Sequence, residues 1–257
     1  MGSIPKKCQL LFDLPETPRN FFLQIVIALL RLFSFAPLFS PAFSFKTMHL
    51  DTIIFDLGGV LIDWNPRHVY RQVFDSEAQM EHFFETICTP DWNEKQDAGR
   101  SLAEATEELV AKHPDWEHEI RMYYGRWRDM LGGAIDNTVN ILRKLKNAKS
   151  HRLYALTNWS AETFPVALET FDFLHWFDGI VVSGTEKTRK PFPEFYRILT
   201  ERYQVQPERA VFIDDVVRNI EGAKAVGFHT IHFQSAEQLA LELKKFGVVI
   251  STDYQTC

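Results

Sequence analysis

The sequence predicts an α/β fold, in which a parallel β-sheet is covered by helices on both faces and an all-helical segment is inserted after the first strand. Three observations support this prediction. Short apolar runs rich in β-branched and aromatic residues recur along the chain, as is typical of strands that are buried on both faces. Helical sequence separates successive runs, as the connection between parallel strands requires. One helical stretch, between the first and second runs, is far longer than the others.

The first strand is expected at residues 52–55, and it ends at the carboxylate of Asp56. Ligands of open α/β sheets bind beyond the carboxyl ends of the strands, so Asp56 occupies a position suited to catalysis. Gly58 and Gly59 permit a tight turn that directs the N–H groups of Leu57 and Gly59 toward an anion. For this stretch alone, an aspartate that merely caps a turn is the competing interpretation.

Four further strands are expected downstream, and with the first they predict a Rossmann-like core. Helices should follow them, one capped by Ser160, one with Pro193 in its first turn and one ending at Gly227. Four of the five strands lead into polar groups, which should converge because the carboxyl ends of parallel strands share one edge of the sheet. These groups are Asp56, Thr157, the loop 183–190 and the pair Asp214-Asp215, and the later strands are at 152–157, 179–183, 210–215 and 228–233.

The same pattern divides the chain into three parts. Residues 48–64 and 136–257 are expected to form the Rossmann-like core. Residues 65–135 have apolar positions at helical spacing without strand-like alternation, which predicts an all-helical insertion of roughly three to five helices. Residues 1–47 are an atypical apolar leader, expected to lie outside the fold, with Met48 as the start of the native protein.

The leader raises the question of a membrane anchor. Residues 21–45 are apolar and aromatic, but Arg31 divides them into uncharged pieces of ten and fourteen residues. Both pieces are shorter than the ~20 residues that a spanning helix needs. An arginine in the middle of such a helix would add about 2.5–3.5 kcal/mol against insertion. Membrane association is therefore expected only if residues 21–45 are a real anchor.

The charge and the cysteines of the chain exclude other classes of protein. The net charge is -6, of which residues 1–47 contribute +3 and the remainder -9. An acidic body without a basic stripe argues against a nucleic-acid partner. Cys8, Cys88 and Cys257 are odd in number and far apart, which predicts neither a disulfide framework nor a zinc site. A reducing, cytoplasmic location fits best.

The converging groups have the composition of a magnesium-dependent phosphoryl-transfer site. Three carboxylates, on Asp56, Asp214 and Asp215, cannot all stay ionised side by side unless a cation joins them. An oxygen-only ligand set suits Mg²⁺. The hydroxyl of Thr157 and the ammonium of Lys190 are natural partners for phosphate. With a metal ion neutralising the substrate oxygens, Asp56 would be free to attack phosphorus.

Four segments, in this order, resemble the four motifs of the haloacid dehalogenase (HAD) superfamily. They are DLGGV at 56–60, LTN at 156–158, KP at 190–191 and FIDD at 212–215, followed by Asn219. The helical insertion is similar to the C1 cap of subfamily I of that superfamily. The resemblance covers residues 48 to about 243 and is strongest to phosphatases that act on sugar phosphates and similar small metabolites. It implies the HAD fold.

The resemblance also implies roles for individual residues. Asp56 would be the nucleophile that becomes an aspartyl-phosphate, Thr157 would bind the transferred phosphoryl group, and Lys190 would hold both. Mg²⁺ would be bound by Asp56, Asp215 and the backbone carbonyl of Gly58, with Asp214 as an alternate ligand or a residue behind the ligands. The phosphate-binding set would be Gly58, Gly59, Thr157, Asn158 and Lys190.

One position departs from the pattern of the family's phosphatases. Most of them carry a second aspartate two residues after the nucleophile, which serves as general acid and then as general base, and here that residue is Gly58. General acid–base catalysis typically contributes about 10²–10⁴-fold, so poor leaving groups should be turned over slowly unless another group substitutes. Asp63, Asp97, His68 and the substrate itself are the candidates.

Side chains near the expected site give a first indication of the substrate. Residues 92–100 are dense in hydrogen-bonding groups and would suit a polyhydroxylated substrate if they face the site. An ordinary polar helix surface is an equal alternative. Trp159 and Phe192 are expected in the core, with a place at the mouth of the site as the alternative.

The expected function is Mg²⁺-dependent hydrolysis of a small phosphomonoester, such as a sugar phosphate, through an aspartyl-phosphate. One alternative is a 2-haloacid dehalogenase, in which Asp56 would attack carbon, but the pair Asp214-Asp215 argues for a metal that such chemistry does not need. The other is a non-catalytic domain that binds phosphorylated metabolites, as the glycine at position 58 suggests. The presence of Asp56, Thr157, Lys190 and Asp215 together argues against it.

Overall fold

The computed structural model describes residues 50–250. The predictions for the leader, residues 1–47, and for Cys8 and Cys257 lie outside the described residues. Within residues 50–250, no helix combines the length and the apolar character that crossing a membrane requires. Cys88, in the same range, is a free and buried thiol.

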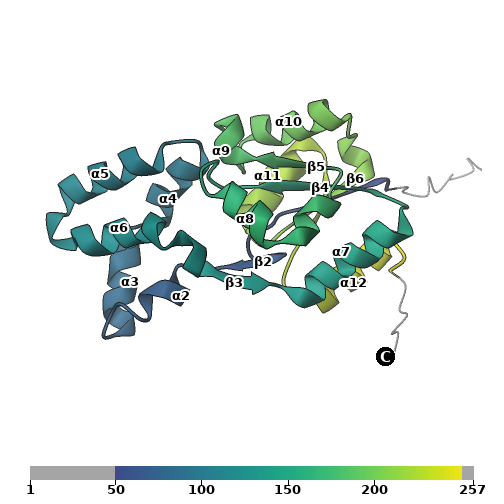
Figure 1. Cartoon of the computed structure of the whole chain (residues 1–257). Coiled ribbons are helices and arrows are strands. Elements are labelled where there is room, and N and C mark those ends of the chain that lie inside the picture. The colour runs from purple at the N-terminus through teal and green to yellow at the C-terminus, as the bar shows by residue number, and fades with distance from the viewer. Residues whose placement is uncertain (1–49, 251–257) are drawn as a thin grey trace, which may run out of the picture. The chain divides into compact units, whose positions relative to one another are not determined.

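A five-stranded parallel sheet forms the centre of the structure (Figure 1). Its strands lie in the order β5-β4-β1-β6-β7, and every neighbouring pair is parallel. The central strand, β1 (Thr52–Phe55), is buried along its whole length because it has a partner on each side and helices on both faces. The predicted α/β fold with a parallel sheet is therefore confirmed. The other strands are β4 (Arg152–Thr157), β5 (Gly179–Val182), β6 (Ala210–Asp214) and β7 (His229–His232).

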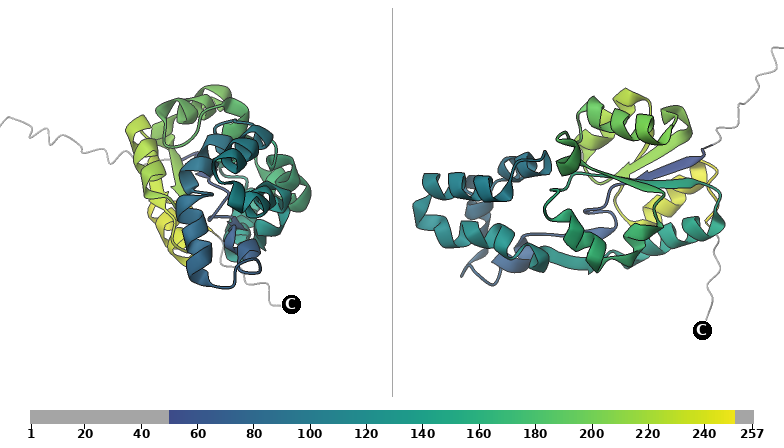
Figure 2. Two further views of the ribbon diagram at one scale, coloured as in Figure 1. Left: turned by 90° about the vertical axis from the view of Figure 1, so that its left-hand side faces the viewer. Right: turned by 45° about the horizontal axis from the view of Figure 1, so that its top comes forward.

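Helices cover both faces of this sheet, as the two further views in Figure 2 show. Alternate side chains of β1 point to opposite faces, so that Ile53 and Phe55 join one hydrophobic cluster and Ile54 joins the other. The cluster around Ile54 includes α10 and α11, and the larger one includes α7, α8 and α12. The helices are α7 (Asp136–Ala148), α8 (Phe164–Thr170), α9 (Ser183–Glu186), α10 (Pro193–Tyr203), α11 (Val217–Val226) and α12 (Ala236–Lys245).

The ends of these helices agree with the predicted turn chemistry in two of three places. Pro193 lies in the first turn of α10, and α11 ends at Gly227, whose φ of 103° is in the left-handed region. The expectation that Ser160 caps the next helix was wrong, because α8 begins only at Phe164. The Ser160 hydroxyl instead accepts a hydrogen bond from the backbone N–H of Glu162, at 3.2 Å, and closes a local turn.

Five α-helices lie between residues 65 and 130, beside the carboxyl ends of the strands (Figures 1 and 2). Three of them are capped at the N-terminus by a side-chain hydroxyl that accepts a hydrogen bond from a backbone N–H of the first turn. The capping residues are Ser76, Thr89 and Ser101. All five fall within the predicted insertion, whose limits at 65 and 135 stay a prediction. They are α2 (Arg67–Tyr70), α3 (Glu77–Thr86), α4 (Pro90–Asp97), α5 (Leu102–Lys112) and α6 (Glu117–Gly125), with 3-10 turns at Pro114–Trp116 and Trp127–Met130.

A two-stranded antiparallel ribbon connects the insertion to the core. It pairs β2 (Ile62–Trp64) with β3 (Leu131–Ala134). The sequence did not predict β3, because glycines at 132 and 133 weaken any strand signal. Close packing explains why residue 132 is a glycine, since a Cβ there would lie 2.1 Å from a carboxylate oxygen of Asp63.

Candidate active site

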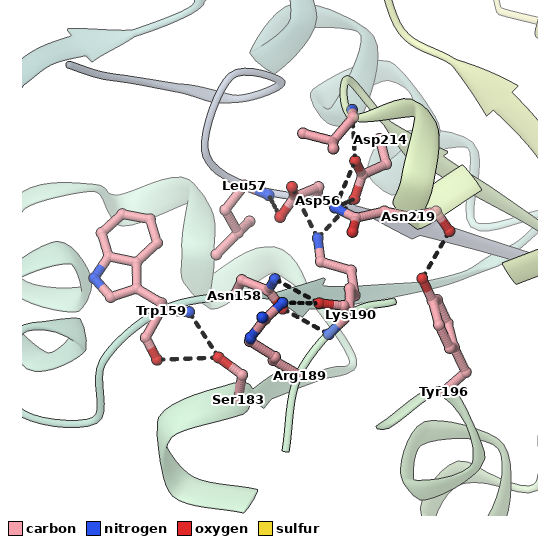
Figure 3. Close-up of polar contacts among 11 residues, drawn as sticks. Asp56, Leu57, Asn158, Trp159, Ser183, Arg189, Lys190, Tyr196, Asp214 and Asn219 are labelled. Atoms are coloured by element: carbon pink, nitrogen blue, oxygen red, sulfur yellow. Dashed lines mark hydrogen bonds and ion pairs between the residues drawn. The ribbon is translucent and has the colours of Figure 1, made fainter. Parts of the chain in front are cut away.

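Three of the predicted side chains meet at the carboxyl edge of the sheet, as Figure 3 shows. Asp56 follows β1, Asp214 ends β6, and Lys190 precedes α10. The Lys190 Nζ lies 2.8 Å from Oδ2 of Asp56 and 2.7 Å from Oδ2 of Asp214. Lys190 and Asp214 are fully buried, and Asp56 is only 7% exposed. One ammonium group is therefore shared by two buried carboxylates.

The charges in this cluster are mutually dependent. Burial raises the pKa of Asp56 to about 7, and Asp214 acts in the same direction while Lys190 opposes it. Burial alone would lower the pKa of Lys190, but Asp214 and Asp56 outweigh it, so that the pKa of Lys190 is raised. Lys190 thus carries its positive charge in the buried site, where a transferred phosphoryl group would need it.

Both oxygens of Asp214 already have donors. Its Oδ1 accepts from the backbone N–H of Val216 at 2.8 Å and from the Asn219 amide at 3.0 Å. Its Oδ2 accepts from Lys190 and, at 3.1 Å, from the same Asn219 amide. The backbone carbonyl of Asn219 in turn accepts from the Tyr196 hydroxyl at 2.7 Å (Figure 3). These contacts favour a role for Asp214 in holding Lys190 and the start of α11, and they make it the less suitable metal ligand of the two adjacent aspartates.

The residues present fit a magnesium ion. Asp56, Asp214 and Asp215 each offer a carboxylate oxygen, and these atoms lie within 4.8 Å of one another. Asp215 is exposed, and its carboxylate packs against Gly59, where a Cβ would lie 2.3 Å from Oδ2. Gly59 also has a φ of 72°, which glycine adopts without strain. An oxygen-only set of this kind suits Mg²⁺ better than zinc or copper.

The buried hydroxyl of Thr157 is a candidate donor to phosphate. Thr157 ends β4, is only 1% exposed, and its Oγ1 has no hydrogen-bond partner among the described residues. Buried hydroxyls are normally hydrogen-bonded, so an orphaned one at the end of β4, the strand that pairs with β1, is suited to a ligand atom that completes it. A phosphoryl oxygen would do so.

The other residues of the predicted phosphate set have internal partners. The Asn158 side chain accepts the backbone N–H of Lys190 at 2.9 Å and donates to its carbonyl at 3.1 Å, and thereby fixes the Lys190 backbone. The N–H of Leu57 donates to Asp56 Oδ1 at 2.7 Å, and that of Gly59 donates to the carbonyl of Ile62 at 2.9 Å. The phosphate-binding roles of Asn158 and of this turn stay predictions.

The three candidates for the acid that Gly58 lacks lie in two places. Asp63 Oδ2 and His68 Nε2 are 2.9 Å apart beside the β2–β3 ribbon, and neither lines the cavity above the site. Asp97, the last residue of α4, lines that cavity together with Asp56 and Gly58. The cavity has a volume of about 610 Å³. The structure therefore brings one of the three candidates to the cavity that Asp56 lines.

The predicted polar segment 92–100 divides between the cavity and the interior. Asn93, Glu94 and Asp97 line the cavity, while Trp92 and Gln96 are buried within the insertion. Trp159 and Phe192 were both expected in the core. Trp159 is buried and lines a smaller adjoining cavity of about 60 Å³, but Phe192 is 50% exposed, so the expectation was wrong for Phe192.

Several lining residues carried no signal in the sequence. The smaller cavity is walled by the rings of Trp64, Tyr124 and Trp127, and the Trp127 ring packs edge-on against Trp159 with centroids 5.5 Å apart. These residues lie on the ribbon and in the insertion, far apart in the chain. No local pattern distinguishes them from core aromatics, because only the tertiary structure brings them together.

Comparisons with known proteins agree with this geometry. A family model described as haloacid dehalogenase-like hydrolase matches residues 50–227. The chain belongs to that family. As a HAD-like hydrolase it is an enzyme of the phosphatase type, as the four motifs predicted, and its parallel sheet is the fold of the family.

Individual relatives of this HAD-like hydrolase are phosphatases. The chain is 27% identical over 192 residues to the sesquiterpene phosphatase astK of Aspergillus oryzae, covering 75% of this chain and 94% of the relative. It is 26% identical to a phosphorylated carbohydrates phosphatase of Thermotoga maritima, covering 71% and 84%. The HAD family enzyme BT-2542 of Bacteroides thetaiotaomicron, solved with magnesium and inorganic phosphate, has the same fold, with a TM-score of 0.56, 20% identity, and coverage of 72% and 95%.

Proposed function

We propose that this HAD-like hydrolase cleaves a small phosphomonoester through an aspartyl-phosphate on Asp56, with Mg²⁺ as cofactor. The observation that carries the proposal is the pairing of Lys190 with both Asp56 and Asp214 in a buried site. A carboxylate fixed in this way, with a lysine beside it and an orphaned hydroxyl nearby, is an arrangement for nucleophilic attack on an anion. The phosphatase relatives support the same reaction class.

The roles follow from the positions of the side chains. A carboxylate oxygen of Asp56 would attack phosphorus, and the bond from phosphorus to the leaving oxygen would break. Lys190 would neutralise charge on the phosphoryl group, and the Thr157 hydroxyl would donate to one of its oxygens. Mg²⁺, held by Asp56, Asp215 and the carbonyl of Gly58, would supply further neutralisation of the phosphate oxygens. Asp214 would keep Lys190 in place.

The size and lining of the cavities support a proposal for the substrate class. The cavity above Asp56 has a volume of about 610 Å³ and is bounded by α4 of the insertion, so the leaving group must fit between the sheet edge and that helix. Rings of three tryptophans adjoin Gly58 and suit a compact leaving group. A sugar phosphate or a similar small phosphorylated metabolite is the proposed substrate. A cytoplasmic location and the absence of a nucleic-acid partner are part of the same proposal.

Phosphate release tests the proposal. The full chain is assayed with p-nitrophenyl phosphate and a panel of sugar and alkyl phosphates, in Mg²⁺, in EDTA and as the Asp56→Asn variant. We expect release that requires Mg²⁺ and is abolished by the substitution. Halide release from 2-chloropropionate that EDTA leaves unchanged would replace the proposal with the dehalogenase. Binding of Mg²⁺ without turnover of any substrate would replace it with the non-catalytic domain.

A further inference from the structure

Gly58 leaves the proposed reaction without a proton donor at the family's usual position. The leaving oxygen needs a proton as its bond to phosphorus breaks, and the attacking water must later lose one. Gly58 has no side chain to supply either. The position is nonetheless spacious, because a Cβ at Gly58 would have no atom within 4 Å. A donor reaching into this space from elsewhere would stand where the family's usual acid stands.

Asp97 is held against that space from the insertion. It lines both cavities that Gly58 lines, the larger one together with Asp56 and Asp215. Asn93, one turn earlier on α4, donates from its amide to Asp97 Oδ2 at 3.3 Å. Ser160, on the core, lines the smaller cavity together with Asp97, and its backbone N–H favours the charged form of this carboxyl. Asp97 is thus held by the insertion and faces the core across the cavity.

A partly buried chain of polar groups fixes Asn93, and through it Asp97. The Asn93 carbonyl oxygen accepts from the Tyr124 hydroxyl at 3.0 Å. Tyr124 accepts from the Gln96 amide at 3.0 Å, and the same amide donates to the carbonyl of Trp92 at 2.7 Å. Gln96 is fully buried. Such a network holds a side chain in one orientation, as a proton-transfer group requires.

The protonation of Asp97 suits both halves of the reaction. Burial raises the pKa of Asp97 to about 7, while Arg189 and Lys190 on the core and the Ser160 N–H oppose that rise. Tyr123 and Tyr124 face it from α6, and burial raises the pKa of each well above the usual range, so both hydroxyls stay neutral. A carboxyl that titrates near neutral pH can give a proton and take one back.

We propose that Asp97, supplied by the helical insertion, is the general acid and then the general base of this hydrolase. In the first step Asp56 bonds to phosphorus, the bond to the leaving oxygen breaks, and that oxygen takes the proton of the Asp97 carboxyl. In the second step a water bonds to phosphorus and passes a proton to the Asp97 carboxylate, as Asp56 and inorganic phosphate separate. The inference rests on the aspartyl-phosphate mechanism of the proposed function.

The Asp97→Asn variant should affect formation and hydrolysis of the aspartyl-phosphate differently. The leaving group of p-nitrophenyl phosphate needs no proton, so the first step should stay fast and the second should slow. We expect a burst of about one p-nitrophenolate per Asp56, an acid-trapped phosphoenzyme, and steady turnover reduced by about 10²–10⁴-fold. With β-glycerol phosphate, whose leaving group needs the acid, the first step should slow as well and the burst should vanish.

Three further variants make the test specific. Asp115→Asn, at an exposed position of the insertion, is the matched control and should change neither rate nor burst. Gly58→Asp introduced into Asp97→Asn should restore turnover at least tenfold, because the open space at Gly58 admits the family's usual acid. A merely structural role for Asp97 predicts loss of activity without a burst and without this rescue, and that result would overturn the proposal. So would a loss in Asp97→Asn of less than threefold on both substrates.

Asp56→Asn separates failure of this inference from failure of the proposed function. If Asp56→Asn abolishes hydrolysis while Asp97→Asn behaves like the control, the aspartyl-phosphate mechanism stands and Asp97 has no part in it. If Asp56→Asn retains hydrolysis, the proposed function itself is wrong, and the assignment of Asp97 is wrong with it.

Discussion

Glu94, on α4 of the insertion, forms an ion pair of 2.6 Å with Arg189, the residue directly before Lys190 in the chain. Arg218, in the first turn of α11, contacts the same carboxylate. The side chains of Glu94 and Arg189 are only 14% and 16% exposed. One carboxylate of the insertion therefore connects the loop that carries Lys190 to the helix that follows Asp215.

Removing this charge should loosen the insertion without touching the nucleophile. Glu94→Gln leaves two arginines without their carboxylate, and we expect kcat/KM to fall by roughly tenfold, about 1.4 kcal/mol. Steady-state kinetics on p-nitrophenyl phosphate measures the change. Glu104→Gln, at an exposed position of α5, is the control and should have no effect. Equal kinetics for the two variants would show that the ion pair does not organise the site.

Removing the Lys190 ammonium should cost both activity and stability. Lys190→Met leaves two buried carboxylates facing each other, and breaking a buried ion pair on one side typically costs about 3–5 kcal/mol. We expect the free energy of unfolding in urea to fall by that order and phosphate release to be lost. Lys95→Met, at an exposed position of α4, should change neither quantity. A Lys190→Met protein as stable as the parent would contradict the structural role.

Adding a methyl group at Gly59 should disturb the metal site selectively. In Gly59→Ala the new Cβ would meet Oδ2 of Asp215 at 2.3 Å, on a backbone with a φ of 72°. We expect Mg²⁺ affinity, measured by calorimetry, to fall at least tenfold, or about 1.4 kcal/mol. Gly58→Ala is the matched control, since its Cβ has open space and its carbonyl is retained. Equal Mg²⁺ affinity in the two variants would count against Asp215 as a ligand.

Replacing Thr157 by valine should separate stability from binding. Among residues 50–250 the buried Thr157 hydroxyl has no partner, so Thr157→Val should leave the free energy of unfolding unchanged or raise it by up to about 1 kcal/mol. Phosphate release should fall by about 10²-fold if that hydroxyl donates to the phosphoryl group. Thr138→Val in α7 removes another buried hydroxyl without a partner and should leave turnover intact. Unchanged turnover in both variants would exclude Thr157 from phosphate binding.

The raised pKa of Asp97 predicts a pH-dependent stability. The folded protein binds this proton more tightly than the unfolded chain does, so the stabilisation is present below the ordinary value of 3.8 and is lost as the pH rises through about 7. Asp97→Asn should therefore have a Tm a few degrees above that of the parent at pH 8, and the difference should shrink toward pH 5. A Tm difference that does not vary with pH would contradict the burial of this carboxyl. Asp115→Asn is the control, and its Tm difference from the parent should not vary with pH.

The sequence was sufficient for the core because its signals are local. An apolar run that ends in a polar residue marks a buried strand of a parallel sheet, and the shared edge of such a sheet then brings Asp56, Lys190 and Asp214 together. The family resemblance already implied different roles for Asp214 and Asp215, but the physical reason needed the structure, since adjacent residues with the same side chain differ only in their surroundings. Hydrogen-bond donors occupy the carboxylate of Asp214, whereas the carboxylate of Asp215 packs against Gly59 and is exposed.

The insertion was harder to read because its functional contacts are long-range. The pair Glu94–Arg189 spans nearly a hundred residues, and no local pattern links its partners. The short strand β3 is defined by its pairing with β2 rather than by its own residues, two of which are glycines. Ser160 is a case in which a local pattern misled the prediction. Its hydroxyl does accept a hydrogen bond from a nearby backbone N–H, but this bond closes a turn and does not start a helix.

Because of the β2–β3 ribbon, the chain leaves the core for the insertion and returns to it at neighbouring positions, so the insertion could be removed as a unit. Trp64, where the chain leaves, is paired with Leu131, where it returns, so the two crossing points are neighbours. A gene encoding a tight turn in place of the intervening residues would still encode the central sheet with its nucleophile and its lysine. What would leave with the excised segment is Glu94 and Asp97. In such an architecture, recombination at one ribbon can exchange the parts that choose a leaving group while the phosphorus chemistry is inherited unchanged.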